Sequence, residues 1–147
     1  MSAMLTQHPE IARVVVSLVP VTDMLRAELH PNGAFVATEF GSVEDREQFE
    51  ALLAYSPYHN VRDGIAYPAT LLTGGEVDLR VDAYHPKKMA ARLQAATSGD
   101  EPILLRVESG GHGIGESLDE AVSGLTDVYV FIFDRLGIAY RPRSTPT

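Results

Sequence analysis

The stretch Ala69–Gly75, ATLLTGG, is the clearest indication of the fold in this 147-residue sequence. It follows the pair Tyr67-Pro68 and stops at two glycines. A short run bounded by proline and glycine predicts a β-strand that is buried on both faces of its sheet. The rest of the chain is interpreted outward from this strand.

Two further runs predict strands of the same kind. Residues 11–20 (IARVVVSLVP) form a β-branched apolar run that ends at a proline, and residues 102–108 (PILLRVE) are followed at once by Ser-Gly-Gly-His-Gly. One run precedes Ala69–Gly75 in the chain and the other follows it. Together the three runs predict a sheet of about three strands.

Helical patterns alternate with these strands. Apolar residues recur at helical spacing over residues 43–55 and 86–96, and again from Ser117 to a stop at Gly137. Ser117 and Glu120 have the spacing of a capping box. Strands alternating with helices predict the α/β class, with a mostly parallel sheet flanked by helices on both faces.

Composition narrows the functional classes. A net charge of −8 with only 12 Lys and Arg argues against a nucleic-acid partner and against an anionic membrane surface. The absence of cysteine excludes disulfides, thiolate metal sites and a cysteine nucleophile. No apolar run approaches the ~18 residues of a membrane span, and the first ten residues lack the pattern of a signal peptide. We therefore expect a soluble protein with a cytoplasmic location, while the periplasm and secretion remain open.

Two polar residues follow the second and third predicted strands. Asp78 lies in the loop GGEVDLRV and His112 in the loop SGGHGIG. Chemistry in parallel sheets lies beyond the carboxyl ends of the strands, so both side chains are expected at one edge. Histidine can take and return a proton near neutral pH, and a buried carboxylate fixes its tautomer. The order acid then histidine is that of the α/β-hydrolase triad, and the glycines would allow a sharp turn around His112.

Simpler interpretations compete with this one. A single aspartate after a strand is usually a turn former or a helix cap. The glycines at 110, 111, 113 and 115 do not have the G-x-G-x-x-G spacing of a dinucleotide site, and no P-loop motif is present. The other histidines lack metal-ligand spacing, so we expect no metal and assign surface or packing roles to His8, His30, His59 and His85.

Four separated blocks resemble the prolyl oligopeptidase family of serine peptidases. They are residues 6–25 (TQHPEIARVVVSLVPVTDML), 55–61 (YSPYHNV), 70–94 (TLLTGGEVDLRVDAYHPKKMAARLQ) and 103–115 (ILLRVESGGHGIG). The blocks keep the family's order and cover nearly the whole chain. The resemblance implies the C-terminal portion of an α/β-hydrolase catalytic domain. It also implies the triad aspartate at Asp78, the triad histidine at His112, a substrate-carbonyl clamp at Arg80, and no cofactor.

The sequence departs from the family pattern in two places. It contains no G-x-S-x-G nucleophile turn, and the nearest segment, residues 115–119, places Ser117 where a helix cap is expected. Residues 1–9 are similar to the segment directly after that turn in the family. Residues 1–147 are therefore expected to be a partial hydrolase domain without the nucleophile elbow and the β-propeller. There is also no tryptophan to stack on a substrate proline; Phe35 lies within a residue or so of that position and is expected to bind substrate.

The sequence thus predicts part of an enzyme that hydrolyses short peptides and is inactive alone. Its expected partners are the remainder of the peptidase, with the nucleophile and propeller, or a second copy of the chain, together with a peptide substrate. The alternative is a non-catalytic dimerising or peptide-binding module. A weaker alternative is an independent hydrolase that uses Ser109 or Ser117.

Overall fold

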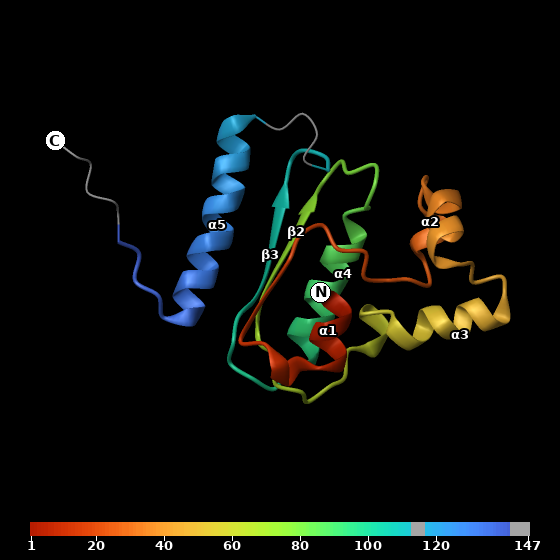
Figure 1. Cartoon of the computed structure of the whole chain (residues 1–147), viewed down its shortest axis with the longest axis horizontal. Helices are drawn as coiled ribbons and strands as arrows, with labels where there is room; N and C mark the ends of the chain where they lie inside the picture. Colours follow the sequence, from red (N-terminus) through yellow and green to blue (C-terminus); the bar gives the residue numbers. More distant parts are fainter. Residues whose placement is uncertain (113–116, 142–147) are drawn as a thin grey trace.

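The computed structural model describes residues 1–112 and 117–141. Its strands and helices alternate along the chain (Figure 1). In chain order the elements are α1 (Ser2–Gln7), a 3-10 turn (Pro9–Ile11), β1 (Val14–Ser17), a 3-10 turn (Ala27–Leu29), α2 (Gly33–Phe40), α3 (Arg46–Tyr55), a 3-10 turn (Tyr58–Asn60), β2 (Ala69–Gly75), α4 (Tyr84–Ala96), β3 (Ile103–Glu108) and α5 (Leu118–Leu136).

The three strands form one parallel sheet in the order β1-β2-β3. Val14 is paired with Ala69 across the first strand pair, and Thr70 with Ile103 across the second. Every residue of the central strand β2 is buried. Strand β2 is buried because it lies between two other strands and helices cover both faces of the sheet. The predicted α/β class and three-stranded parallel sheet are confirmed.

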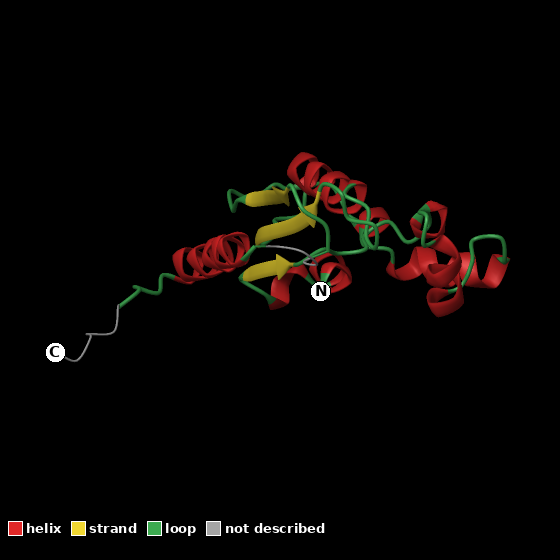
Figure 2. Ribbon diagram, turned by 90° about the horizontal axis from the view of Figure 1, so that it is seen from above, coloured by secondary structure: helices red, strands yellow, loops and turns green. Residues whose placement is uncertain are grey.

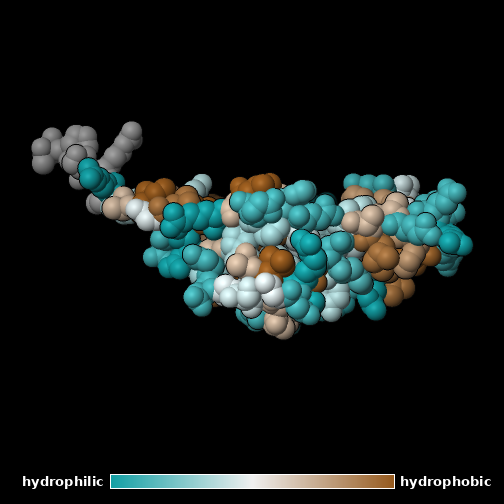
Figure 3. Space-filling model, turned by 90° about the horizontal axis from the view of Figure 1, so that it is seen from below, coloured by the Kyte–Doolittle hydropathy of each residue, from teal (hydrophilic) through white to brown (hydrophobic). Residues whose placement is uncertain are grey.

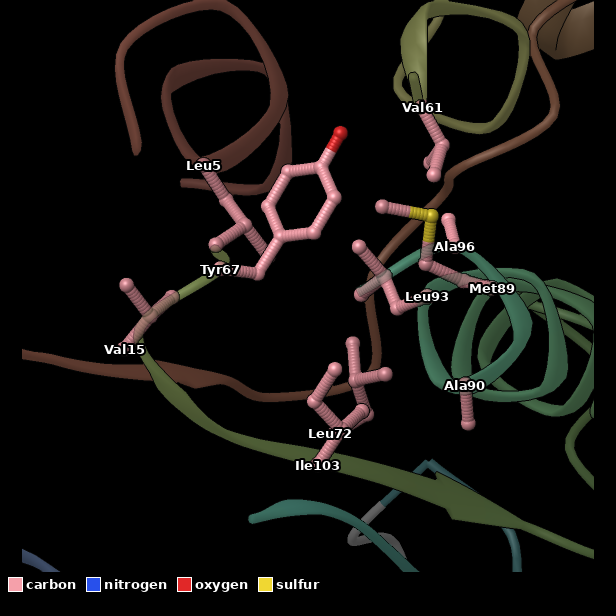
Figure 4. Close-up of a cluster of buried hydrophobic side chains, with 10 residues drawn as sticks. All are labelled: Leu5, Val15, Val61, Tyr67, Leu72, Met89, Ala90, Leu93, Ala96 and Ile103. Carbon is pink, nitrogen blue, oxygen red and sulfur yellow. The ribbon is translucent and has the colours of Figure 1, made fainter. Parts of the chain in front are cut away.

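The larger core lies on one face of the sheet, beneath α1 and α4. Successive side chains of a strand point to opposite faces, so Val15, Leu72 and Ile103 share this side. Figure 4 shows ten buried side chains that meet here: Leu5, Val15, Val61, Tyr67, Leu72, Met89, Ala90, Leu93, Ala96 and Ile103. The helical spacing of the α4 residues in this set explains why α4 buries one face against the sheet.

The opposite face is covered by α5. Phe131 packs with Ala69 and Leu71, and Val128 joins them from the same helix. Figure 2 shows α5 on one side of the strands and α4 on the other. The sheet is therefore a middle layer between helices, as the sequence predicts.

The ends of α5 follow from its sequence. The Ser117 hydroxyl accepts a hydrogen bond from the Glu120 N–H, and the Glu120 carboxylate accepts one from the Ser117 N–H, which confirms the predicted capping box. The helix ends at Gly137, which adopts the left-handed conformation (φ +67°). Ser117 is therefore a helix cap.

The N-terminal half differs from the sequence-based expectation. The strand predicted over residues 11–20 contains only Val14–Ser17, because Ile11 closes a 3-10 turn and Val19 has a φ of +45°, which no strand tolerates. The predicted helix over residues 43–55 starts at Arg46, where the Asp45 side chain caps it. Helices α1 and α2 were not predicted, and Figure 1 shows α2 and α3 extending away from the sheet.

Candidate catalytic site

The acid loop follows the end of β2. The Oδ1 atom of Asp78 accepts hydrogen bonds from the backbone N–H groups of Arg80 (2.7 Å) and Val81 (2.9 Å). This turn is a local property of the sequence, since aspartate commonly bonds backbone N–H groups two and three residues ahead. It fixes the carboxylate and leaves Oδ2 for another partner.

That partner is His112, on the loop after β3. Its Nδ1 atom lies 2.7 Å from Oδ2 of Asp78, whose side chain is fully buried, while the imidazole is partly exposed. The expected approach of the two side chains is confirmed. Because Nδ1 faces the carboxylate, Nε2 is the ring nitrogen that is left for a reacting group.

The electrostatics of Asp78 suit an orienting carboxylate. Burial acts to raise its pKa, but the hydrogen bonds from the Val81 and Arg80 backbone and from His112 outweigh that effect. The pKa of Asp78 is therefore below its ordinary value. The group is ionised at neutral pH and attracts the proton on Nδ1.

A cavity of about 330 Å³ lies beside His112 at the carboxyl ends of the strands. It is lined by the chain after β1, the ends of β2 and β3, the loop after β3 that carries His112, and α5. The lining residues are Leu18, Val19, Thr73, Gly74, Gly75, Arg106, Glu108, Gly111, His112, Ala121, Gly124, Leu125 and Val128. The strained Val19 is held here, since its N–H donates to the Thr73 hydroxyl (3.2 Å). No sequence pattern indicates this contact, which joins residues 54 positions apart.

The two predicted substrate-binding residues lie outside this cavity lining. The side chain of Arg80 is exposed, and its backbone is tied to Asp78. Phe35 is 71% exposed on α2. The Asn32 side chain, at the start of α2, donates a hydrogen bond to the carbonyl of Leu79 in the acid loop. Helix α2 is thereby attached to the loop that carries Asp78 and Arg80.

His85 packs in the interior, as expected. Its Nδ1 accepts hydrogen bonds from the backbone N–H groups of Thr22 (3.3 Å) and Asp23 (3.2 Å). Burial lowers the pKa of His85 to about 4 and outweighs the opposing effect of Asp23, so the ring is neutral. Among residues 1–112 and 117–141, no group of three or more His, Asp or Glu side chains is arranged to hold a metal ion.

A parallel sheet with an acid and a histidine loop at its carboxyl edge defines the C-terminal portion of an α/β-hydrolase fold. The sequence matches the prolyl oligopeptidase family over residues 1–139. The chain belongs to the prolyl oligopeptidase family.

Relatives and solved structures agree. The chain is 40% identical over 138 residues to a prolyl endopeptidase of Elizabethkingia meningoseptica, covering 92% of this chain and 20% of that protein. It is 34% identical to one of Dictyostelium discoideum, covering 94% of this chain and 19% of that protein. A solved prolyl endopeptidase superposes with a TM-score of 0.89 at 37% identity, over 94% of this chain and 20% of that chain. The chain thus spans about a fifth of the length of these relatives.

None of the helices in the described part of the chain is both long and apolar enough to span a membrane.

Proposed function

We propose that this chain supplies the acid and the base of a serine-peptidase triad, with His112 as general base and acid and Asp78 as its orienting carboxylate. The observation that carries the proposal is the 2.7 Å contact between His112 Nδ1 and Asp78 Oδ2, with Oδ1 held by two backbone N–H groups. In this arrangement only Nε2 remains to exchange protons with a nucleophile and a leaving group.

The proposed reaction is acyl transfer from a peptide. A serine oxygen bonds to the scissile carbonyl carbon while His112 Nε2 takes the hydroxyl proton. The C–N bond then breaks, and His112 returns that proton to the leaving amine. Water attacks the acyl-enzyme with the same assistance, and the acid product and the free serine are released. Asp78 stabilises the imidazolium at each stage.

Substrate contacts are assigned to two residues. Arg80 is proposed to hold a substrate carbonyl, because the resemblance to the family places the carbonyl-binding arginine at this position and its side chain is exposed on the loop that carries Asp78. Phe35 is proposed to present an aromatic face to the substrate from α2, which Asn32 attaches to the acid loop. Short peptides are the proposed substrates; a related prolyl oligopeptidase B of Galerina marginata was solved bound to a 35mer hydrolysis and macrocyclization substrate.

The nucleophile is proposed to come from the rest of the peptidase. The 147-residue sequence contains no G-x-S-x-G segment, and Ser117 caps α5. We accordingly propose that residues 1–147 form part of a hydrolase domain and depend on a separate nucleophile-bearing segment for activity.

An apolar surface on α5 supports a partner of this kind. A groove of about 820 Å³ runs along the outer side of the helix, lined by Val122, Leu125, Thr126, Tyr129, Val130, Phe133, Asp134, Ile138 and Tyr140. Figure 3 shows apolar side chains exposed near the C-terminal end of the molecule. An apolar surface of this extent is normally covered by another part of a protein. The same surface favours the second candidate, a dimerising or peptide-binding module.

Labelling with a fluorophosphonate, which reacts with activated serines, separates the candidates. The 147-residue chain is expected to remain unlabelled. A chimera, in which residues 1–139 replace the matching fifth of the Elizabethkingia meningoseptica prolyl endopeptidase, is expected to be labelled and to cleave peptides. Stoichiometric labelling of Ser109 or Ser117 in the isolated chain would favour an independent hydrolase. A folded but inactive chimera would reject the triad role and favour the binding module.

A further inference from the structure

The two glycines that end β2 have different neighbours. A Cβ atom built on Gly74 would lie 2.7 Å from Cγ of Pro86, in the first turn of α4. A Cβ atom on Gly75 would lie 2.5 Å from the carbonyl oxygen of Gly111 and 2.6 Å from that of Gly110. Gly74 thus faces a core helix, whereas Gly75 faces the backbone that leads directly into His112.

The loop after β3 that leads to His112 (residues 109–112) is held against the loop after β2 that carries Asp78 (residues 76–81). The Glu76 N–H donates to the Glu108 carbonyl (2.8 Å), and the Val77 N–H donates to the Gly110 carbonyl (3.3 Å). The next link outward is the bond between Asp78 and His112. The two loops therefore continue the β2–β3 pairing beyond the sheet, and Gly75 is the last β2 residue before this contact begins.

We propose that Gly75 is a positioning residue for His112: the absence of a side chain lets residues 110–111 lie close enough to β2 for His112 to reach Asp78. Its importance for catalysis rests on the proposed function. A methyl group at 75 would meet backbone atoms, which cannot rotate away as a side chain can. Gly75 is paired with Glu108 of β3, whereas residues 110–111 lie beyond the end of β3, so the displacement falls on the histidine loop.

The glycines next to His112 do not have this role. A Cβ on Gly110 would meet no atom within 4 Å, and one on Gly111 would lie at an ordinary contact distance of 3.6 Å from the Val77 carbonyl. Neither has the positive φ that favours glycine. At Gly110 and Gly111, neither space nor backbone conformation requires a glycine; Gly113 and Gly115, the other glycines expected to allow a sharp turn around His112, lie outside the described residues. The glycine that the close approach of the two loops requires is Gly75, which lies on β2 opposite residues 110–111.

Four alanine variants of the 147-residue chain test the proposal. Two NMR readouts report on the pair: the His112 Nδ1–H proton signal, which persists only in a protected hydrogen bond, and the pKa of the Asp78 carboxyl group. Gly75→Ala is expected to lose the proton signal and to raise the pKa of Asp78 toward its ordinary value. Gly110→Ala and Gly111→Ala should keep both signals. Gly74→Ala should lower the melting temperature while the pair remains, which separates loss of stability from loss of positioning.

In the chimera, Gly75→Ala is expected to lower kcat/KM for a peptide about tenfold or more, since small misplacements of catalytic groups are costly. Gly110→Ala, whose added methyl group would meet no atom within 4 Å, should stay near the parent value. An intact Asp78–His112 signal in Gly75→Ala would overturn the proposal. So would failure of Gly75→Ala to fold while the other three variants fold, because Gly75 would then act on the fold. Altered signals in Gly75→Ala within an inactive parent chimera would leave the positioning role standing and reject the proposed function instead.

Discussion

The Nδ1 atom of His112 lies 2.7 Å from the Oδ2 atom of Asp78, although 34 positions separate the two residues in the chain. They meet because β2 and β3 are parallel neighbours, so that the loops after them leave the sheet at the same edge. The rigid part of this pair is the acid, which two backbone N–H groups hold in place.

Replacing Asp78 by asparagine tests the orienting role. Asparagine keeps the shape of the side chain but removes the charge that fixes the imidazole tautomer. In the chimera we expect Asp78→Asn to lower kcat by about 10⁴-fold, and His112→Ala to cost several orders of magnitude as well. Peptide hydrolysis under saturating substrate measures both. Asp82→Asn is the matched control, because Asp82 accepts a hydrogen bond from the Tyr84 N–H, which asparagine can also accept. Equal losses in Asp78→Asn and Asp82→Asn would point to a general defect of the loop.

The contribution of Arg80 to catalysis is expected to depend on the length of the substrate. Its backbone N–H, which holds Asp78, survives any change of its side chain. We therefore expect Arg80→Met to leave hydrolysis of a small ester within a few-fold of the parent chimera, while kcat/KM for a longer peptide falls at least tenfold, about 1.4 kcal/mol in binding of the transition state. The ratio of the two rates is the measurement. An equal loss on both substrates would mean that Arg80 supports the site and does not hold a substrate carbonyl.

Phe35 is expected to contribute to substrate binding from α2. Its ring is exposed, so its removal costs little stability. In the chimera we expect Phe35→Ala to raise KM for a peptide with proline before the cleaved bond by about threefold to tenfold, with kcat less affected, as loss of an aromatic contact of about 1 kcal/mol implies. Phe35→Tyr should restore binding. Unchanged KM values in Phe35→Ala would remove Phe35 from the site.

Stability should fall between about pH 6.5 and pH 4 because of His85. Its pKa is lowered to about 4 in the fold, whereas an unfolded histidine titrates near 6.5, so the unfolded chain binds the extra proton in this window. The stabilisation is complete above about pH 6.5, and about 3 kcal/mol is lost as the pH falls to 4. Burial also lowers the pKa of His59, which acts in the same direction.

Urea unfolding of the chain at pH 7 and pH 5 measures this loss. His85→Asn supplies an oxygen acceptor close to the position of Nδ1 and cannot titrate, so its stability should change less between the two pH values. A chain whose stability is the same at pH 7 and pH 5 would contradict the assignment of a neutral, buried His85.

The outer edge of β1 predicts association of the isolated chain. In the described sheet β1 pairs with β2 alone, which leaves backbone groups of Val14–Ser17 without a strand on the other side. We expect light scattering to show dimers or larger species, in which this edge is covered by a second copy, and the chimera to be free of this association. Leu18→Lys adds a charge at the exposed end of the edge and should weaken association. A stable monomer with slow hydrogen exchange along β1 would show a self-sufficient domain and favour the binding module.

Elements whose signals are local could be predicted from the sequence. The strand Ala69–Gly75 was predicted with its observed bounds, because its flanking proline and glycines mark both ends. The start of α5 was predicted from Ser117 and Glu120, and its end from Gly137. Each of these signals acts within the helical turn at its own end. The bond from Asp78 to the next backbone N–H groups is local in the same sense, and the family resemblance located Asp78 and His112 in the chain.

Features that depend on contacts between distant segments could not be predicted in this way and are visible in the folded chain alone. The first strand is four residues long instead of ten, because a 3-10 turn occupies Pro9–Ile11 before it and Val19 turns the chain toward Thr73 after it. The apolar run 11–20 indicated neither turn. The glycine pair at the end of β2 indicated a strand stop, but which glycine must lack a side chain depends on what lies opposite: Pro86 for Gly74 and the backbone of residues 110–111 for Gly75. Sequence patterns record the conformation that a segment prefers. The distance between two loops is set by the packing of the whole sheet, which no single segment contains.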